Sequence, residues 1–276
     1  MTNTMYLSTH TLQRLKGVQA LLDQLQPEAE PRAFVVPGGP EPRGSVIVFP
    51  GSFNPPTTAH IALLKQARAF AHIQESMTLY AAFSKRTVDK EAVERPLLLD
   101  RIVLLDDILH KRLPHAGILL FNRGLYVEQA EAIHHSFPRV KRILFLLGFD
   151  KIVQILDPHY YQDRDVSLFE LFKRAELLVA PRGNAGEKEL AELLHQPQNQ
   201  RFAHFIHALS FNAMYRNVSS TSARQGASGS VSEVPQEARL FMRKTRAYAP
   251  PLEKRDGTKV DYYGLRMQHL QHLLHQ

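Results

Sequence analysis

The hydrophobic positions of the chain form short apolar runs that alternate with helical patterns. From Ser45 onward, runs typical of strands are followed by segments in which apolar residues recur every three or four positions. The strand candidates are Val46–Phe49, Met77–Phe83, Gly117–Phe121, Arg142–Leu147, Leu177–Ala180 and Phe202–Leu209. The helix candidates between them are Thr58–Ala71, Leu97–Leu113, Tyr126–His135, Leu168–Ala175 and Glu187–His195. Most strand runs are apolar throughout, so both faces of the sheet are expected to be covered. The pattern predicts an α/β fold with a doubly wound, mostly parallel, Rossmann-like sheet.

The beginning of the chain has a different pattern, typical of an extra N-terminal helix followed by a linker. Its apolar residues recur at intervals of three or four, at Leu12, Leu15, Val18, Leu22 and Leu25. Ser8 or Thr9 is the expected N-cap, and a connector rich in proline and glycine follows, with one short strand at Ala33–Val36. The apolar face must be covered, either by the main domain or by another subunit of a homo-oligomer. We therefore divide the chain into an N-terminal extension, residues 1–44, and a main domain, residues 45–276.

The end of the chain is predicted to be helical. Helical patterns cover Ser222–Gln225 and Pro235–Ala247, and a terminal helix is expected in the segment that ends in "LQHLLHQ". Between the first two lies "GASGS" (Gly226–Ser230), whose small residues are typical of a mobile loop.

Composition and charge narrow the class of partner. The 276 residues are 44% hydrophobic, which is enough for a sizeable core, and the absence of cysteine excludes disulfides, thiolate metal sites and thiol nucleophiles. A formal net charge of +7 favours anionic partners such as phosphates and nucleotides. The basic residues are spread along the chain without a basic tail, so nucleic acid is an unlikely partner.

We find neither a long apolar run nor a secretory signal pattern. We therefore expect no membrane span and a soluble intracellular protein of the cytoplasm, and the sequence does not distinguish this location from the nucleus.

One stretch, "FPGSFNPPTTAHIALLKQARA" from Phe49 to Ala69, joins a predicted strand to a predicted helix. Gly51 and Ser52 let the backbone approach a ligand, and the two prolines that follow stiffen the loop. Thr57 is a good N-cap, which places His60 in the first helical turn. Free N–H groups and the positive end of the helix dipole gather there. The stretch is therefore predicted to form an anion cradle with one imidazole donor.

The same residues resemble a known signature. "GSFNPPTTAH" resembles the (His/Thr)-x-x-His element of nucleotidyltransferases, and within them the nicotinamide or nicotinate mononucleotide adenylyltransferases, with Thr57 and His60 at the two named positions. Far downstream, "NVSSTSARQG" is similar to the family's I-S-S-T-x-x-R segment. The residues that match it are Ser219, Ser220, Thr221 and Arg224. Hydroxyls, backbone amides and a guanidinium at a helix start suit a phosphate group.

Weaker matches lie between these two elements. "FLLGFDK" resembles an L-x-G-x-D segment, which would place Gly148 and Asp150 beside the nucleotide ribose. "VAPRGN" resembles a strand followed by Arg-x-Gly, which would place Arg182 near the adenine and the phosphates. Lys85 follows the second predicted strand, where family members carry a phosphate-binding lysine, and Arg86 and Lys90 compete for that role.

The resemblance implies adenylyl transfer from ATP to a pyridine mononucleotide, with the dinucleotide and pyrophosphate as products. His60 and Arg224 would be the catalytic residues, and His60 would donate to the α-phosphate. The phosphates of ATP would be held by Gly51, Ser52, Phe53, Thr57, His60, Ser219, Ser220, Thr221 and Arg224. An ionised phosphate acceptor needs no general base, so the protein mainly positions the reactants and stabilises charge. Mg²⁺ would be held by the ATP phosphates rather than by a protein metal site.

The chain departs from the family on the acceptor side. Many members stack the pyridine ring on a tryptophan, and this chain has none. Tyr126 is the best-placed substitute, with Phe121 behind it, and Asn54 is assigned to the same acceptor side. The alternatives are a nucleotide-binding scaffold or regulatory protein, an ATP hydrolase that retains the fold, or an adenylyltransferase or cytidylyltransferase for another phosphorylated acceptor.

Overall fold

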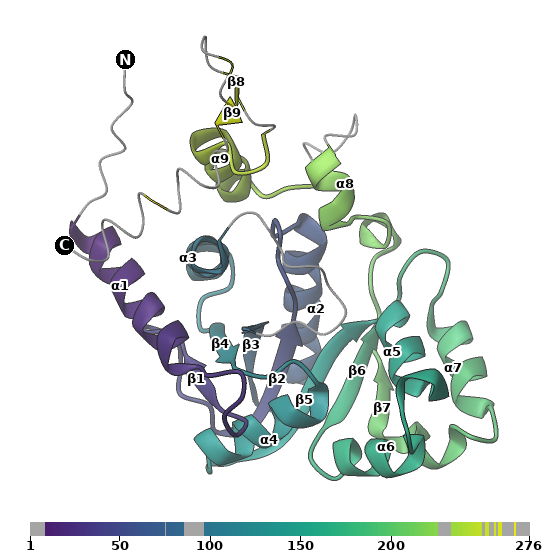
Figure 1. Ribbon diagram of the computed structural model, residues 1–276. Coiled ribbons are helices and arrows are strands. Elements are labelled where there is room, and N and C mark those ends of the chain that lie inside the picture. Colours follow the sequence, from purple (N-terminus) through teal and green to yellow (C-terminus); the bar gives the residue numbers. More distant parts are fainter. Residues whose placement is uncertain are drawn as a thin grey trace.

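One seven-stranded sheet organises the molecule (Figure 1). The computed structural model describes residues 9–74, 76–85, 97–225, 233–249, 252–253, 257, 259–260 and 268. The strands lie in the order β1-β4-β3-β2-β5-β6-β7. Their bounds are β1 Ala33–Val35, β2 Gly44–Pro50, β3 Met77–Ser84, β4 Gly117–Phe121, β5 Val140–Gly148, β6 Glu176–Ala180 and β7 Ile206–Ala208. A separate short pair comprises β8 Leu252–Glu253 and β9 Lys259–Val260.

The order of the strands reverses next to β2. The chain runs outward from β2 through β3 to β4, and then returns to place β5, β6 and β7 on the other side of β2. All neighbouring strands from β4 to β7 pair in parallel, and only the edge strand β1 is antiparallel, with Ala33 opposite Phe121. The carboxyl ends of β2 and β5 therefore flank a topological switch point, where open α/β sheets bind their ligands.

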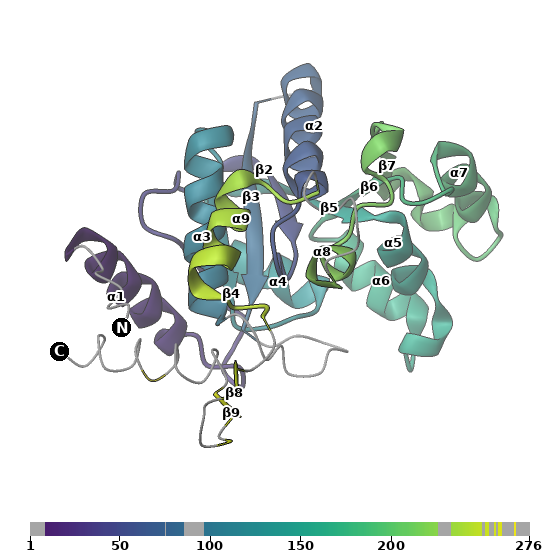
Figure 2. The ribbon, with the colours of Figure 1, turned by 90° about the horizontal axis from the view of Figure 1, so that it is seen from above.

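Helices cover both faces of the sheet. Alternate residues of a strand point to opposite faces, so one strand can contribute side chains to two core clusters. Ile47 and Phe49 of β2 lie in a first core cluster, whereas Val46 and Val48 lie in a second. The first face is covered by α1 Thr9–Gln24, α2 Thr58–Gln74, α3 Leu98–Arg112, α8 Ser220–Gln225 and α9 Gln236–Thr245. The second is covered by α4 Tyr126–Ser136, α5 Phe149–Leu156, α6 Arg164–Phe172 and α7 Glu187–His195. Seen from above, α2 and α3 lie on one side of the strands and α5 and α6 on the other (Figure 2).

The N-terminal helix and strand belong to this core. Four apolar residues of the α1 segment are buried in the first cluster, namely Leu15, Val18, Leu22 and Leu25. α1 packs against α3, and Arg14 forms ion pairs with Asp106 and Asp107 of that helix. The predicted helix and short strand are thus confirmed, while the division of the chain after residue 44 stays a prediction.

Most predicted elements are confirmed, and the largest error is the last strand. Its first half forms a 3-10 helix, η2 Gln200–Phe205, and only Ile206–Ala208 pairs in the sheet. The reason is packing: the Phe202 ring is fully buried and contacts Phe169 and Phe172 at centroid distances of 5.1 and 5.5 Å.

Two helices also differ from the sequence prediction. α5 begins directly at the end of β5, without the polar break that would announce it, and was not predicted. α6 begins four residues before Leu168, because the Asp163 carboxylate accepts from the Val166 N–H at 3.0 Å and caps it. Two short 3-10 turns, η1 Pro158–Tyr160 and η3 Ala213–Tyr215, complete the elements of the described chain.

Some predictions fall outside the described residues. These are the Ser8 cap, the "GASGS" loop, most of the terminal helix, and the competing cations Arg86 and Lys90. Among the helices in the part of the chain that is described, none has the length and apolar character needed to cross a membrane.

Candidate active site

The loop Gly51–Thr57 leaves the end of β2 at the switch point and is shaped by a buried aromatic ring. Phe53 adopts a positive φ of 43° and is fully buried. Its ring packs edge-on against Phe83 at 5.2 Å and against His60 at 5.0 Å between ring centroids. A Cβ on Gly51 would lie 3.0 Å from the Phe53 ring, so the glycine leaves room for that ring. The Asn54–Pro55 peptide bond is cis. The Phe53 side chain thus supports the loop from within the core.

Thr57 and His60 hold each other at the start of α2. The Thr57 N–H donates to Nδ1 of His60 at 2.9 Å, and the Thr57 hydroxyl lies 2.8 Å from the same nitrogen. Because Nδ1 accepts from a backbone N–H, the ring hydrogen of the neutral imidazole is assigned to Nε2. Burial, followed by the positive charge of Arg182, lowers the pKa of His60 to about 4. At neutral pH this residue is therefore an uncharged Nε2–H donor.

The second sequence element, residues 219–224, lies directly against this loop. Nη1 of Arg224 donates to the Asn54 carbonyl at 2.5 Å, and Ser220 Oγ donates to the Pro55 carbonyl at 2.9 Å. Arg224 also donates through Nη2 to the Thr221 hydroxyl at 3.2 Å. These contacts join segments more than 160 residues apart in sequence. The two motifs therefore form one site.

The serine directly before α8 has a local role. Ser219 Oγ accepts from the Ser222 N–H at 3.1 Å, which makes Ser219 the N-cap of this helix. The cap orders the turn from which Ser220 and Thr221 project.

The far side of the switch point carries an ion pair. Nε of Arg182, which follows β6, lies 2.7 Å from the Asp150 carboxylate in the first turn of α5. Both side chains are about half exposed or more, at 49% and 69%. A Cβ on Gly148 would lie 3.9 Å from Cδ of Arg182, so this glycine borders the same pair.

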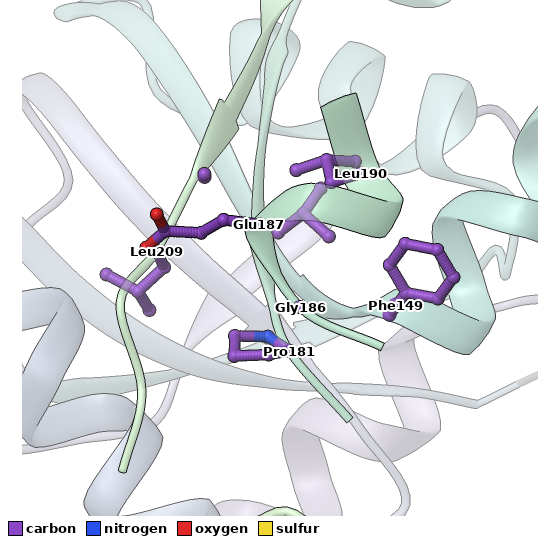
Figure 3. A pocket seen from close by; sticks show the side chains of 8 residues that line it. Phe149, Pro181, Gly186, Glu187, Leu190 and Leu209 are labelled. Atoms are coloured by element: carbon purple, nitrogen blue, oxygen red, sulfur yellow. The ribbon is translucent and has the colours of Figure 1, made fainter. Parts of the chain in front are cut away.

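A narrow apolar hollow lies beside that ion pair, at the ends of β6 and β7 (Figure 3). Leu209 and Pro181 lie opposite Phe149 and Leu190 in this view, with Gly186 between them at the start of α7. Its lining residues are Phe149, Val179, Pro181, Gly186, Glu187, Leu190, Ala208 and Leu209. These side chains close the hollow, which is too narrow to hold a water molecule.

The groups at the ends of β3 and β4 bind the chain itself. Nζ of Lys85 donates to the Leu22 carbonyl at the end of α1, at 2.7 Å. The Asn122 amide donates to three carbonyls of the α1–β1 connection, those of Gln26, Ala29 and Glu30. Arg123, which follows Asn122, donates to the Ala29 carbonyl at 3.0 Å. The connection therefore covers this end of the sheet.

The aromatic residues assigned to the acceptor lie in or against the second core cluster. Phe121 is fully buried, so its ring is enclosed by the core and does not reach a ligand in this structure. Tyr126 is partly buried and contacts Phe145 edge-on at 5.2 Å, and burial raises the pKa of its hydroxyl. The stacking role of Tyr126 stays a prediction, and Phe121 can at most support it from behind.

Three residues next to the loop were not identified from the sequence. Nη1 of Arg101, a residue 8% exposed, donates to the Ser52 carbonyl at 2.9 Å. The Tyr248 hydroxyl donates to Oδ1 of Asn54 at 2.6 Å, and the Glu233 carbonyl accepts from the Thr58 N–H at 2.7 Å. The "DR" pair inside the apolar run "LLLDRIVLL" could have indicated a buried cation with a specific partner. The sequence carries no comparable signal for Tyr248 or Glu233.

The arrangement of strands and helices can be compared with known structures. The chain shares its fold with a nicotinic acid mononucleotide adenylyltransferase. That protein is the Plasmodium falciparum enzyme, complexed with APC; the TM-score is 0.50 and the identity 14%, over 74% of this chain and 96% of that one. A structure described as a putative nicotinate-nucleotide adenylyltransferase from Vibrio parahaemolyticus aligns with a TM-score of 0.40 at 13% identity, over 74% of this chain and 95% of that one. Neither a protein-family model nor a curated protein matches the sequence.

The comparison confirms the predicted fold class. The chain has a Rossmann-like nucleotidyltransferase fold with a mixed, mostly parallel seven-stranded sheet and an N-terminal helix. At 14% identity the likeness concerns the fold, and activity has to be argued from the site.

Proposed function

We propose that this protein transfers the adenylyl group of ATP to nicotinamide or nicotinate mononucleotide. The observation that carries the proposal is His60, which Thr57 holds as a neutral Nε2–H donor at the switch point of a nucleotidyltransferase fold. Because the neutral His60 donor is already oriented, it can stabilise the negative charge that develops on a phosphate in the transition state without reorganisation of its surroundings.

In the proposed reaction, a phosphate oxygen of the mononucleotide attacks the α-phosphorus of ATP. The bond from the α-phosphorus to the bridging oxygen of the β-phosphate breaks, and pyrophosphate leaves with that oxygen. His60 donates to the α-phosphate, while Ser220, Thr221 and Arg224 hold the departing phosphates. Arg182 adds positive charge on the opposite side.

Mg²⁺ fits this site as a companion of ATP. The Asp150 carboxylate is paired with Arg182 at 2.7 Å, and the residues described around the loop are mainly hydrogen-bond donors. Over the described part of the chain, no group of three or more His, Asp or Glu side chains is placed to hold a metal ion. We propose that the ion is bound mainly by the ATP phosphates, whose charge it neutralises.

A second candidate is a nucleotide-binding protein with another acceptor or none. The observation that favours it is the acceptor side of the sheet, where Lys85, Asn122 and Arg123 bind carbonyls of the α1–β1 connection. Arg123 is a residue that could pair with the carboxylate of a nicotinate ring, but its Nη1 lies 3.4 Å from the Glu128 carboxylate. A phosphorylated acceptor must displace some of these contacts or bind beside them.

The test is a direct assay. The purified chain is incubated with ATP, Mg²⁺ and either nicotinamide or nicotinate mononucleotide, and products are detected by mass. The proposal expects a dinucleotide and pyrophosphate in equal amounts, and none with His60→Ala at the same enzyme concentration. ATP binding without any dinucleotide would support the second candidate, and release of ADP or AMP without acceptor would indicate hydrolysis.

A further inference from the structure

Asn54 stands between the two halves of the site. Its carbonyl accepts from Arg224 at 2.5 Å, and its side-chain Oδ1 accepts from the Tyr248 hydroxyl at 2.6 Å. The residue is only 6% exposed. Tyr248 follows α9, so a residue near the end of the described chain reaches the loop that begins at Gly51.

The hydrogen bond from the Tyr248 hydroxyl fixes the orientation of the Asn54 carboxamide. An asparagine side chain can exchange its oxygen and its nitrogen by rotating half a turn about its last bond. The Tyr248 hydroxyl donates to Oδ1, which leaves the two N–H donors of Nδ2 on the other side. Within the residues described by the structure, Nδ2 has no hydrogen-bond partner. In a residue that is only 6% exposed, an accessible amide donor without a protein acceptor is suited to an acceptor supplied by a ligand.

We propose that Tyr248 is a positioning residue that orients the Asn54 carboxamide so that its N–H groups donate to the phosphates of the nucleotide. The inference rests on the proposed function, in which Arg224 beside Asn54 holds the same phosphates. Tyr248 acts only through Asn54. Burial raises the pKa of the Tyr248 hydroxyl, with Arg101 and Arg224 opposing and Asp100 adding to the shift. The hydroxyl therefore remains a donor throughout the neutral range.

The test compares Tyr248→Phe in two backgrounds. In the wild-type background the substitution removes only the hydroxyl, and we expect kcat to fall about tenfold with KM for ATP changed less than threefold. Asn54→Asp replaces the carboxamide by a carboxylate, whose two oxygens are equivalent and leave no orientation to set. In that background Tyr248→Phe should change kcat less than twofold. An equal fold loss in both backgrounds would overturn the proposal.

Tyr161→Phe is the matched control. The Tyr161 hydroxyl donates to the Ile155 carbonyl at 2.7 Å in the second core layer. Its loss should cost similar stability without a change in kcat. A kcat loss in Tyr161→Phe equal to that in Tyr248→Phe would show a merely structural effect.

A second measurement does not depend on turnover. The side-chain amide signals of Asn54 are followed by ¹⁵N NMR while a non-hydrolysable ATP analogue with Mg²⁺ is added. We expect a large shift in the wild-type protein and at most half of it in Tyr248→Phe. The same shift in both proteins, or none in either, overturns the inference. A wild-type protein that shows the shift but forms no dinucleotide would instead contradict the proposed function alone.

Discussion

His60 combines two tasks in one side chain. Its Nδ1 accepts from the Thr57 N–H and so completes the cap of α2, and this contact leaves Nε2–H for the proposed donation to the α-phosphate. The two nitrogens can be separated by substitution, because the side-chain oxygen of asparagine lies near the position of Nδ1 and its amide does not reach the position of Nε2.

His60→Asn should therefore keep the cap and lose the donor. We expect kcat to fall about 100- to 1000-fold, as for the loss of one donor aimed at developing charge, with ATP affinity within a few-fold. Steady-state kinetics and ATP titration measure the two quantities. His60→Gln is the matched control, since glutamine retains a distal N–H donor and can also accept from the Thr57 N–H as a capping-box residue, so it should keep more turnover than His60→Asn. Near wild-type turnover in His60→Asn would contradict the assigned role.

The lowered pKa of His60 predicts a pH effect on stability. The pKa is about 4 in the folded protein against 6.5 as the ordinary value. Between these limits the unfolded chain binds a proton that the folded chain does not, so stability falls as the pH drops from 6.5 to 4, and His60 has no effect above that window. The full effect corresponds to about 3 kcal/mol. Denaturant unfolding of wild type and His60→Asn should show a stability difference that changes through this window. A constant difference would contradict the assignment.

At the scale of elements, the α1–β1 connection depends on one buried amide. Asn122 is 1% exposed, its Nδ2 serves three carbonyls of the connection, and its Oδ1 accepts from the Arg32 N–H at 2.8 Å. The connection is in turn what brings β1 to the edge of the sheet beside β4. The fold of this segment thus relies on polar contacts as well as on the buried leucines of α1.

Asn122→Asp should destabilise the protein by about 3 kcal/mol. The carboxylate can still accept from Arg32, but it cannot donate to the carbonyls and is repelled by them. Asn212→Asp is the matched control, because Asn212 is exposed and its Oδ1 only accepts from the Met214 N–H at 3.0 Å. That variant should change stability by less than about 0.5 kcal/mol. Equal unfolding free energies for the two variants would show that the Asn122 contacts do not hold the connection.

At the scale of the whole molecule, the sheet is continuous from β1 to β7 and both cores lie against it. Four side chains of the α1 segment are buried in the first core, and burial of each is worth about 1.5–3 kcal/mol. Their sum is comparable to the stability of a typical domain. The N-terminal part is therefore energetically coupled to the nucleotidyltransferase fold.

We accordingly expect one unfolding transition for the full chain. Calorimetry and near-ultraviolet circular dichroism should report the same midpoint, and Leu15→Ala should lower the free energy of unfolding by about 2–5 kcal/mol. Removal of residues 1–44 should leave a chain that does not fold stably. Two separate transitions, or a truncated protein with an unchanged melting temperature, would show instead that these residues are an independent arm.

Features that depend on neighbours along the chain could be predicted from the amino-acid sequence. The apolar runs specify strands β2 to β6, and the spacing of Thr57 and His60 specifies a capped helix start, because both act over a few residues. The predicted phosphate-binding motif near Arg224 was also visible as a local pattern of hydroxyls and one cation. Its pairing with the first motif followed only from the resemblance to a family.

Contacts between distant segments could not be predicted from the sequence, because they depend on how the whole chain folds. The hydrogen bond between Tyr248 and Asn54 joins residues 194 positions apart in the sequence, and that between Lys85 and Leu22 joins residues 63 positions apart. No local pattern encodes either contact. A polar side chain on a helix or loop has many acceptors within reach, and the order of strands in the sheet selects among them. The same holds for two buried aromatic residues. Only the packing of the second core shows that Phe121 is enclosed there rather than exposed at a ligand site, and that Phe202 lies in the core rather than in a strand.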